Sequence, residues 1–338
     1  MDIIEYAKEK AKKNPVKVAF PEAEDIKMAT AISICAKEGY CVPIVLGNID
    51  EVKKICKENS IDDSEFEYID YHDEKLKADI LSTYLKQPNI IFGEKSLTRR
   101  MEDPVYFALM MQKCGKVDVT FAGINSSTGD IIFAAQSIIG LKNNLDVISS
   151  VGIADIPGYT FPDGGHLLAV GDCAVCANPS ASELASIAIS TCDTIKSVTG
   201  WIPKCALLSY STAGSAEGEL VDKVRTAVEL ANERRPDLLI DGEFQLDAAI
   251  CPEIAKKKVK RDSKVAGQAN IVIFPDLNAG NIGVKLIQQF GHANAYGPLL
   301  QGFSMICCDC SRSAPVDELV GNIIFSVVRA GDLKNDKK

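Results

Sequence analysis

Ser311, Arg312, Asp317 and Glu318 together supply the groups that acyl transfer to a thiol requires. Such a reaction needs a cation for the leaving anion, a donor for the charge on the carbonyl oxygen, and a base for the thiol proton. Arginine binds phosphoryl groups in a bidentate manner, and a carboxylate further along the chain can accept the proton directly or through the serine. The residue types alone leave a second interpretation open, a helix cap followed by a solvated face.

Two glycine-containing segments before Ser311 are candidates for binding substrate. FPDLNAGNIGVKLIQQF (274–290) places Asn281 and Gly283 where an apolar run gives way to a helix, and helix N-termini bind anions. YGPLLQG (296–302) adds Gln301. We expect a strand-to-loop-to-helix junction at Asn281 and Gly283 that can hold an anion.

A hydroxyl-rich loop, NSSTGD (125–130), lies between an expected strand and an expected helix. Its Ser127 and Thr128, together with backbone amides, suit a phosphate group or a carbonyl oxygen, and a plain N-cap is the alternative. DGEFQLDAAI (241–250) carries three acids that could bind a divalent cation or brace the end of a strand. These are Asp241, Glu243 and Asp247.

The composition excludes several classes of function. A net charge of −9 argues against nucleic acid as the main partner. The charged N-terminus has no secretory pattern and no apolar run is long enough to span a bilayer, so we expect a cytoplasmic protein that does not bind membranes. The twelve cysteines are scattered, and Cys173-x-x-Cys176 has no second pair to complete a zinc site. We expect buried structural thiols and no metal.

Short apolar runs alternate with amphipathic stretches, which predicts an α/β protein with parallel-rich sheets flanked by helices. Glu22–Asp25 are interpreted as acids in the first turn of a helix, and the region from about 50 to 100 reads as polar and less regular. We expect the second domain at 146–295 and the first at 1–145 plus 296–338, with a helix at 316–331 that docks on the first half.

In this order, the four segments at 241–250, 274–290, 296–302 and 309–312 resemble the phosphotransacetylase (phosphate acetyltransferase) family, within the phosphate acetyl/butyryltransferase superfamily. The resemblance covers nearly the whole chain. It implies two α/β domains with the active-site cleft between them, a layout related to isocitrate dehydrogenase, and usually a homodimer. It also implies reversible acetyl transfer between acetyl phosphate and coenzyme A, with phosphate as the other product and no cofactor.

The resemblance assigns roles residue by residue. Ser311 and Arg312 match the family serine and arginine, and the family aspartate falls on Glu318, beside Asp317. The family arginine five residues after Thr128 is replaced by Phe133.

Arg99 and Arg100 are therefore expected to assist in binding, on the phosphate of coenzyme A. Two alternatives stay open, a phosphate butyryltransferase or other short-chain acyltransferase, and a binding protein for acyl phosphate or coenzyme A with little turnover.

Overall fold

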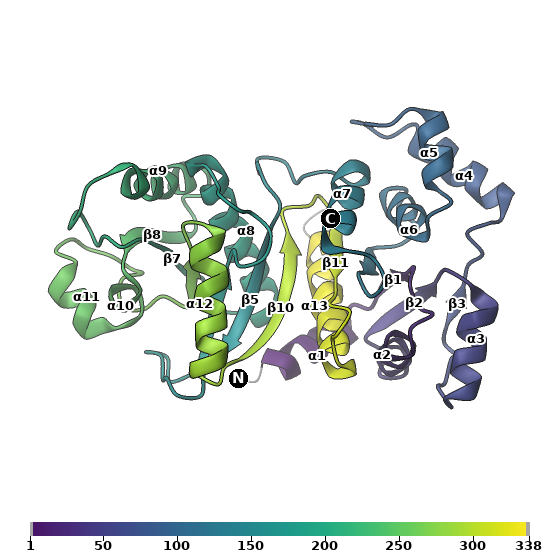
Figure 1. Ribbon diagram of the computed structural model, residues 1–338, viewed down its shortest axis with the longest axis horizontal. Coiled ribbons are helices and arrows are strands. Elements are labelled where there is room, and N and C mark those ends of the chain that lie inside the picture. Colours follow the sequence, from purple (N-terminus) through teal and green to yellow (C-terminus); the bar gives the residue numbers. More distant parts are fainter. Residues whose placement is uncertain (1–2, 336–338) are drawn as a thin grey trace. The chain divides into compact units, whose positions relative to one another are not determined.

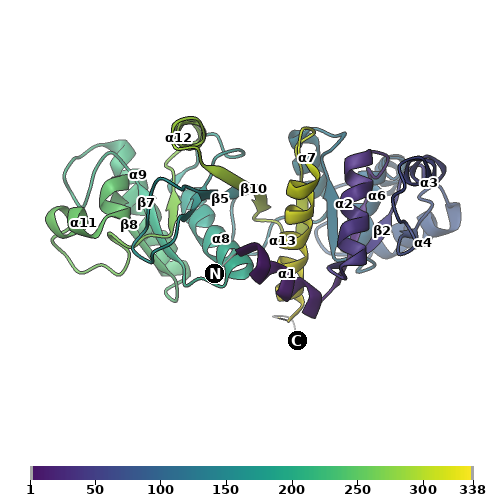
Figure 2. The same ribbon diagram turned by 90° about the horizontal axis from the view of Figure 1, so that it is seen from below.

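The computed structural model describes residues 3–335, which divide into two compact units. Described residues up to Lys142 and from Phe303 onward form the first unit, and Asn143–Gly302 form the second. Each unit is built on its own sheet with helices packed against it, as Figures 1 and 2 show. Among the described residues, no helix is long and apolar enough to cross a membrane.

The first unit holds a five-stranded sheet in the order β11-β4-β1-β2-β3, in which every neighbouring pair is parallel. The strands are β1 (Val16–Phe20), β2 (Cys41–Val45), β3 (Glu67–Tyr68), β4 (Val119–Ala122) and β11 (Ile306–Asp309). All of β4 and all of β11 are buried, as expected for strands covered on both faces. Since β11 lies beside β4, its last residue reaches the same edge of the sheet as the loop after β4.

Helices of the first unit begin at recognisable caps. Asp25, Asp103 and Ser127 each accept a hydrogen bond from the first turn of the helix that follows. The helices are α1 (Ile3–Lys13), α2 (Ile26–Lys37), α3 (Ile49–Glu58), α4 (Glu74–Tyr84), α5 (Glu94–Arg100), α6 (Pro104–Lys113), α7 (Thr128–Ile138) and α13 (Val316–Asn335).

The expectation of an irregular region from about 50 to 100 is wrong, because α3, α4 and α5 fill most of it. In α3 only Val52 and Cys56 are buried and most of the other residues are charged, so the segment is polar overall although its few apolar residues recur at helical spacing. The expected C-terminal helix is confirmed as α13, which packs against α1, α2 and β11. Figure 2 shows α13 (yellow) beside α1 and α2.

The second unit holds a six-stranded sheet in the order β10-β5-β6-β9-β7-β8. The strands are β5 (Ser149–Asp155), β6 (Leu167–Gly171), β7 (Lys204–Leu208), β8 (Leu239–Phe244), β9 (Ile271–Ile273) and β10 (Asn294–Gln301). β6, β9, β7 and β8 are parallel, whereas β5 and β10 run antiparallel to their neighbours. Because β10 pairs with β5, the chain returns to the first unit after Gly302, later than the position 296 expected from the sequence.

The helices of the second unit cover both faces of this sheet. They are α8 (Ala181–Thr199), α9 (Glu219–Arg234), α10 (Leu246–Ile250), α11 (Pro252–Lys258) and α12 (Leu277–Phe290). α8 begins at a capping box formed by Ser180 and Glu183 and ends at Gly200, which has a left-handed conformation. It packs against β5, β6, β7 and β9, and Figure 2 shows α12 on the opposite face.

Candidate active site

Three segments meet at the carboxyl edge of the sheet in the first unit. They follow β1, β4 and β11, which are neighbours in the sheet and parallel. Glu22 follows β1, the loop 123–128 follows β4, and the segment 309–312 follows β11. The carboxyl edge of parallel strands is where α/β proteins place their binding sites.

Glu22 fixes the loop after β4. Its side chain is buried, and its Oε2 accepts hydrogen bonds from the amides of Gly123 (2.7 Å) and Ile124 (2.9 Å). The Ser126 hydroxyl also donates to this carboxylate. Glu22 was expected in the first turn of a helix, but α2 begins only at Ile26, after the Asp25 cap. The sequence interpretation is therefore corrected, since Glu22 braces a loop from a distant part of the chain.

Thr128 connects that loop to the end of β11. Its hydroxyl donates to Oδ2 of Asp309 over 2.5 Å, and Ser127 caps α7 by accepting from the amide of Asp130. Gly123 lies against the same carboxylate with φ +110°, and a Cβ built there would collide with Oδ1 of Asp309. A side chain at 123 would thus be both strained and obstructed.

The segment after β11 presents Ser311 and Arg312 to solvent. The Ser311 hydroxyl lies 2.9 Å from the hydroxyl of Ser313, and the backbone carbonyl of Arg312 accepts from Nζ of Lys27 at 2.8 Å. Within the part of the chain that the structure describes, the Arg312 guanidinium has no ion pair or hydrogen bond. This cation is therefore available to an anionic ligand.

Two carboxylates follow in the first turn of α13. Asp317 is exposed, whereas Glu318 is half-buried, and that burial raises the pKa of Glu318 above its ordinary value. A raised pKa suits a carboxylate that must accept a proton near neutral pH. The structure thus places Ser127, Thr128, Ser311, Arg312, Asp317 and Glu318 on segments of one sheet edge.

Arg99 and Arg100 end α5, also in the first unit, but their surroundings differ. Arg99 is exposed. The Arg100 guanidinium lies over the rings of Phe92, Tyr106 and Phe133, at 4.0, 4.9 and 5.9 Å from their centroids. It donates to the Tyr106 hydroxyl, and its Nε has no partner in the described residues. Among the described residues, no carboxylate forms an ion pair with the Arg100 guanidinium.

Asn281, Gly283 and Gln301 belong to the second unit, and the first two lie inside α12. The helix starts at Leu277, where Asp276 accepts from the amide of Ala279. The expected junction at Asn281 and Gly283 is therefore wrong. Asn281 instead donates to the carbonyl of Cys173 over 3.2 Å. A Cβ on Gly283 would lie 3.2 Å from the ring of Phe274, so this glycine serves packing.

Gln301 is a buried brace at the end of β10. Its Nε2 donates to the hydroxyls of Ser149 (3.0 Å) and Thr191 (2.8 Å), which ties β10 to β5 and α8. Both amide hydrogens are used in this way, and only its Oε1 lacks a partner in the described residues. Nearby, a cavity of about 150 Å³ is lined by residues that include Cys173, Val284 and Tyr296.

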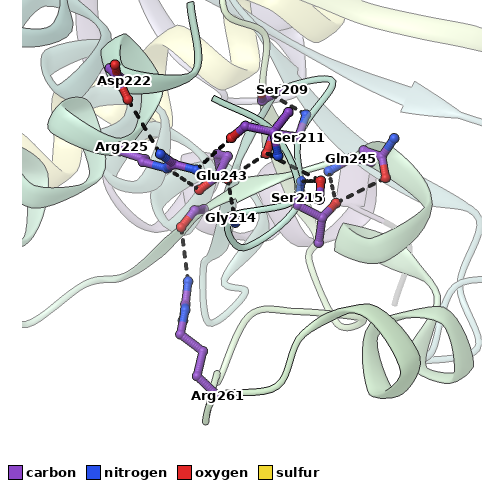
Figure 3. A network of polar contacts seen from close by, with 12 residues as sticks. Ser209, Ser211, Gly214, Ser215, Asp222, Arg225, Glu243, Gln245 and Arg261 are labelled. Carbon is purple, nitrogen blue, oxygen red and sulfur yellow. Dashed lines mark hydrogen bonds and ion pairs between the residues drawn. The ribbon is translucent and has the colours of Figure 1, made fainter. Parts of the chain in front are cut away.

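The acids of the segment 241–250 are held by basic side chains. Glu243 is buried and pairs with Arg225, and it also accepts from the Ser211 hydroxyl and the Gly214 amide. Figure 3 shows these three groups converging on Glu243. Asp241 pairs with Arg261 and Asp247 with Lys258. These contacts favour a bracing role for the three acids over cation binding. No group of three possible metal ligands is found in the described residues.

We expect Arg225→Ala to lower the free energy of unfolding by about 3 kcal/mol, because it leaves Glu243 buried without its cation. Burial alone raises the pKa of Glu243, but Arg225, Gly214 and Ser211 lower it to about 2. A lowered pKa means that this stability is present above the ordinary glutamate range and is lost as pH falls towards 2. Urea unfolding at pH 7 and pH 3 measures both effects.

Arg261→Ala is the matched control, since it removes an arginine whose side chain is 46 % exposed from the same region. We expect it to cost about 1 kcal/mol or less. Equal losses in the two variants would contradict the special role of Arg225.

Comparison with known proteins decides the family. A model of the family described as phosphate acetyl/butaryl transferase matches residues 2–327. The chain belongs to this family. It is 40 % identical to the phosphate acetyltransferase of Thermoanaerobacterium thermosaccharolyticum over 98 % of this chain and 100 % of that one. The enzyme of the same name from Clostridium acetobutylicum is 39 % identical, with 98 % and 99 % covered.

Among solved structures, the EutD phosphotransacetylase from Staphylococcus aureus is similar, with a TM-score of 0.88 and 34 % identity. The match covers 97 % of this chain and 98 % of that one. The family and the α/β fold class predicted from the sequence are confirmed, and so is the expectation of an acyltransferase.

Within this transferase family, two residues of the site escaped the sequence interpretation. Asp309, in the segment 309–312, was given no role, and Glu22 was interpreted only as an acid in the first turn of a helix. Both are acids placed directly after, or at the end of, an apolar strand, and that position was the available signal.

Proposed function

We propose that this protein is a phosphate acetyltransferase, which transfers an acetyl group reversibly between acetyl phosphate and coenzyme A. The observation that carries the proposal is the carboxyl edge of the sheet in the first unit, where the segments after β4 and β11 lie side by side. These segments carry exposed hydroxyls, the carboxylate of Glu318 with its raised pKa, and Arg312, which is unpaired among the described residues. Relatives named phosphate acetyltransferase that match the chain over nearly its whole length support the choice of substrates.

In the proposed reaction, the sulfur of coenzyme A attacks the carbonyl carbon of acetyl phosphate. The carbon–sulfur bond forms as the thiol proton passes to Glu318 or Asp317, with help from Ser311. The bond between the carbonyl carbon and the bridging oxygen then breaks, and phosphate leaves in contact with Arg312, Ser127 and Thr128. Much of the rate would come from holding both substrates in place. Coenzyme A is a substrate here, and the step uses no further cofactor.

The test is the initial rate of thioester formation from coenzyme A with acetyl, propionyl and butyryl phosphate in parallel. We expect acetyl phosphate to be preferred, with a kcat on the order of 1–10³ s⁻¹. Preference for butyryl phosphate would instead identify a phosphate butyryltransferase. Coenzyme A binding without turnover on any of the three would identify a binding protein.

Arg100 is the proposed cation for a phosphate group of the substrate, most simply that of coenzyme A. Its guanidinium lies 5.9 Å from the ring centroid of Phe133, the residue that stands where the family has an arginine. Arg100 therefore brings positive charge near that place from a different helix. Aromatic rings stabilise a cation but do not neutralise it, and an anionic ligand would therefore bind there favourably.

We expect Arg100→Ala to raise KM for coenzyme A about tenfold with little change in kcat, because it removes one charge-assisted contact. The comparison ligand is 3′-dephospho-coenzyme A, for which the variant and the wild type should agree if the contact is made to the 3′-phosphate. Arg99→Ala removes the same charge one residue away and should have a smaller effect. If both substitutions raised KM equally, Arg100 would contribute only general positive charge and no specific contact with coenzyme A.

We further propose a homodimer located in the cytoplasm. α12 carries an exposed apolar stripe, Ile282, Leu286 and Phe290, of which Phe290 is 81 % exposed, and β10 forms one edge of its sheet. Such a surface is typical of a face that another copy covers.

All twelve cysteines are free thiols, which fits a reducing compartment such as the cytoplasm. The partners are small molecules, and the net charge of −9 disfavours nucleic acid.

A further inference from the structure

Asp309 holds a position at the site that the proposed reaction does not yet use. It ends β11 two residues before Ser311, and its side chain is 8 % exposed. Oδ2 accepts the hydroxyl hydrogen of Thr128 over 2.5 Å, whereas Oδ1 has no partner in the part of the chain that is described. Burial of a carboxylate with one unpaired oxygen disfavours its charged form, so it favours protonation of Asp309.

We propose that Asp309 is a positioning residue, which decides through its own proton whether the Thr128 hydroxyl donates to Asp309 or to an oxygen of a bound phosphoryl group. While Asp309 is ionised it can only accept, so the single hydroxyl hydrogen of Thr128 points to it. Once Asp309 is protonated it donates to Thr128 Oγ1, and the hydroxyl hydrogen is released for the ligand. This inference rests on the proposed function, in which Thr128 contacts the phosphoryl group.

The surroundings of Asp309 place this change in an accessible pH range. Burial raises the pKa of Asp309 to about 6, the Thr128 hydroxyl opposes this, and the Glu22 carboxylate adds to it. Glu22 itself is occupied by the amides of Gly123 and Ile124 and by the Ser126 hydroxyl.

The other titratable groups around Asp309 are thiols and one carboxylate. Cys308 and Cys310 flank it in the chain, and burial raises the pKa of both thiols, that of Cys308 to about 12, so both remain neutral between pH 5 and 8. Glu318 on α13 interacts with Cys310, and burial raises the pKa of Glu318 as well. The pKa of Glu318 is shifted in the same direction as that of Asp309, so the experiment must separate the two carboxylates.

The test measures the affinity of inorganic phosphate by calorimetry from pH 5 to pH 8 for the full chain and its variants. The ionisation of phosphate is common to all of them and cancels in each ratio of Kd values. In Asp309→Asn, the amide can donate to Thr128 at every pH, as protonated Asp309 does. We expect this variant to match the wild type at pH 5 and to bind phosphate about tenfold more tightly at pH 8.

Thr128 variants separate positioning from charge, because loss of the negative charge at position 309 would by itself favour phosphate. We expect the effect of Asp309→Asn to shrink when it is combined with Thr128→Val, which has no hydroxyl, and to return when it is combined with Thr128→Ser. A full effect of Asp309→Asn in the presence of Thr128→Val would overturn the positioning role. A pH step that survives in Asp309→Asn would assign the titration to Glu318 or another group.

Two controls separate this inference from misfolding of a variant and from failure of the proposed function. Thr128 is exposed, so the Thr128 variants can be measured even if Asp309→Asn does not fold. The pH dependence of phosphate binding should then be smaller in Thr128→Val than in Thr128→Ser. Phosphate binding is measured without turnover. A protein that shows the predicted pH step but no acetyl transfer would therefore refute the proposed function and leave this inference intact.

Discussion

Arg312→Ala should lower kcat/KM for acetyl phosphate by about 100- to 1,000-fold, the usual loss when a group that stabilises transition-state charge is removed. The guanidinium is exposed and has no anionic partner in the described residues, so it is available to the anionic substrate of the proposed reaction. Steady-state rates with acetyl phosphate as the varied substrate measure the loss. The hydrogen bond that Lys27 donates to Arg312 is accepted by the backbone carbonyl, so the substitution leaves it in place.

Arg312→Lys is the informative comparison for this prediction. Lysine keeps the charge but cannot form two parallel hydrogen bonds to a phosphoryl group. We expect it to recover only part of the activity, mainly in KM. An alanine variant with unchanged kcat/KM would show that Arg312 is not the clamp for the phosphoryl group.

Glu318→Gln should lower kcat by about 100-fold or more in the direction of acetyl-CoA formation, since general-base catalysis contributes about 10²- to 10⁴-fold. Burial raises the pKa of Glu318, so the carboxylate is protonated, and inactive as a base, at a higher pH than an ordinary glutamate. The wild-type kcat should therefore fall on the acid side of this raised pKa, and the variant should lose that limb of the profile.

Asp317→Asn is the matched control, one residue earlier in the same turn and exposed to solvent. We expect it to retain more activity than Glu318→Gln. The reverse order would make Asp317 the base. The profile also distinguishes Glu318 from Asp309, because the first is expected to act on kcat and the second on the affinity for phosphate.

Local patterns predicted most of the regular structure. The strand expected before the loop 125–130 is β4, the helix expected after it is α7, and the helix expected at 316–331 is α13. Each of these signals is carried by adjacent residues. The helix α3 was missed because most of its residues are polar. The start of α12 at Leu277 was missed because a glycine in a helix resembles a glycine in a loop. Only tertiary packing distinguishes a helical glycine from a loop glycine. Gly283 is an example, because it lies inside α12 and packs against the ring of Phe274.

The sequence by itself determined the family, the α/β class and the residue types available for acyl transfer, since these depend on short segments read in order. Tertiary structure decided which of them meet. Glu22, Thr128 and Asp309 are far apart in the chain, and they come together because β1, β4 and β11 are parallel neighbours. Arg100 reaches Phe133 in the same way, through the packing of separate helices. Strand order and helix packing arise from long-range burial, which no local pattern encodes.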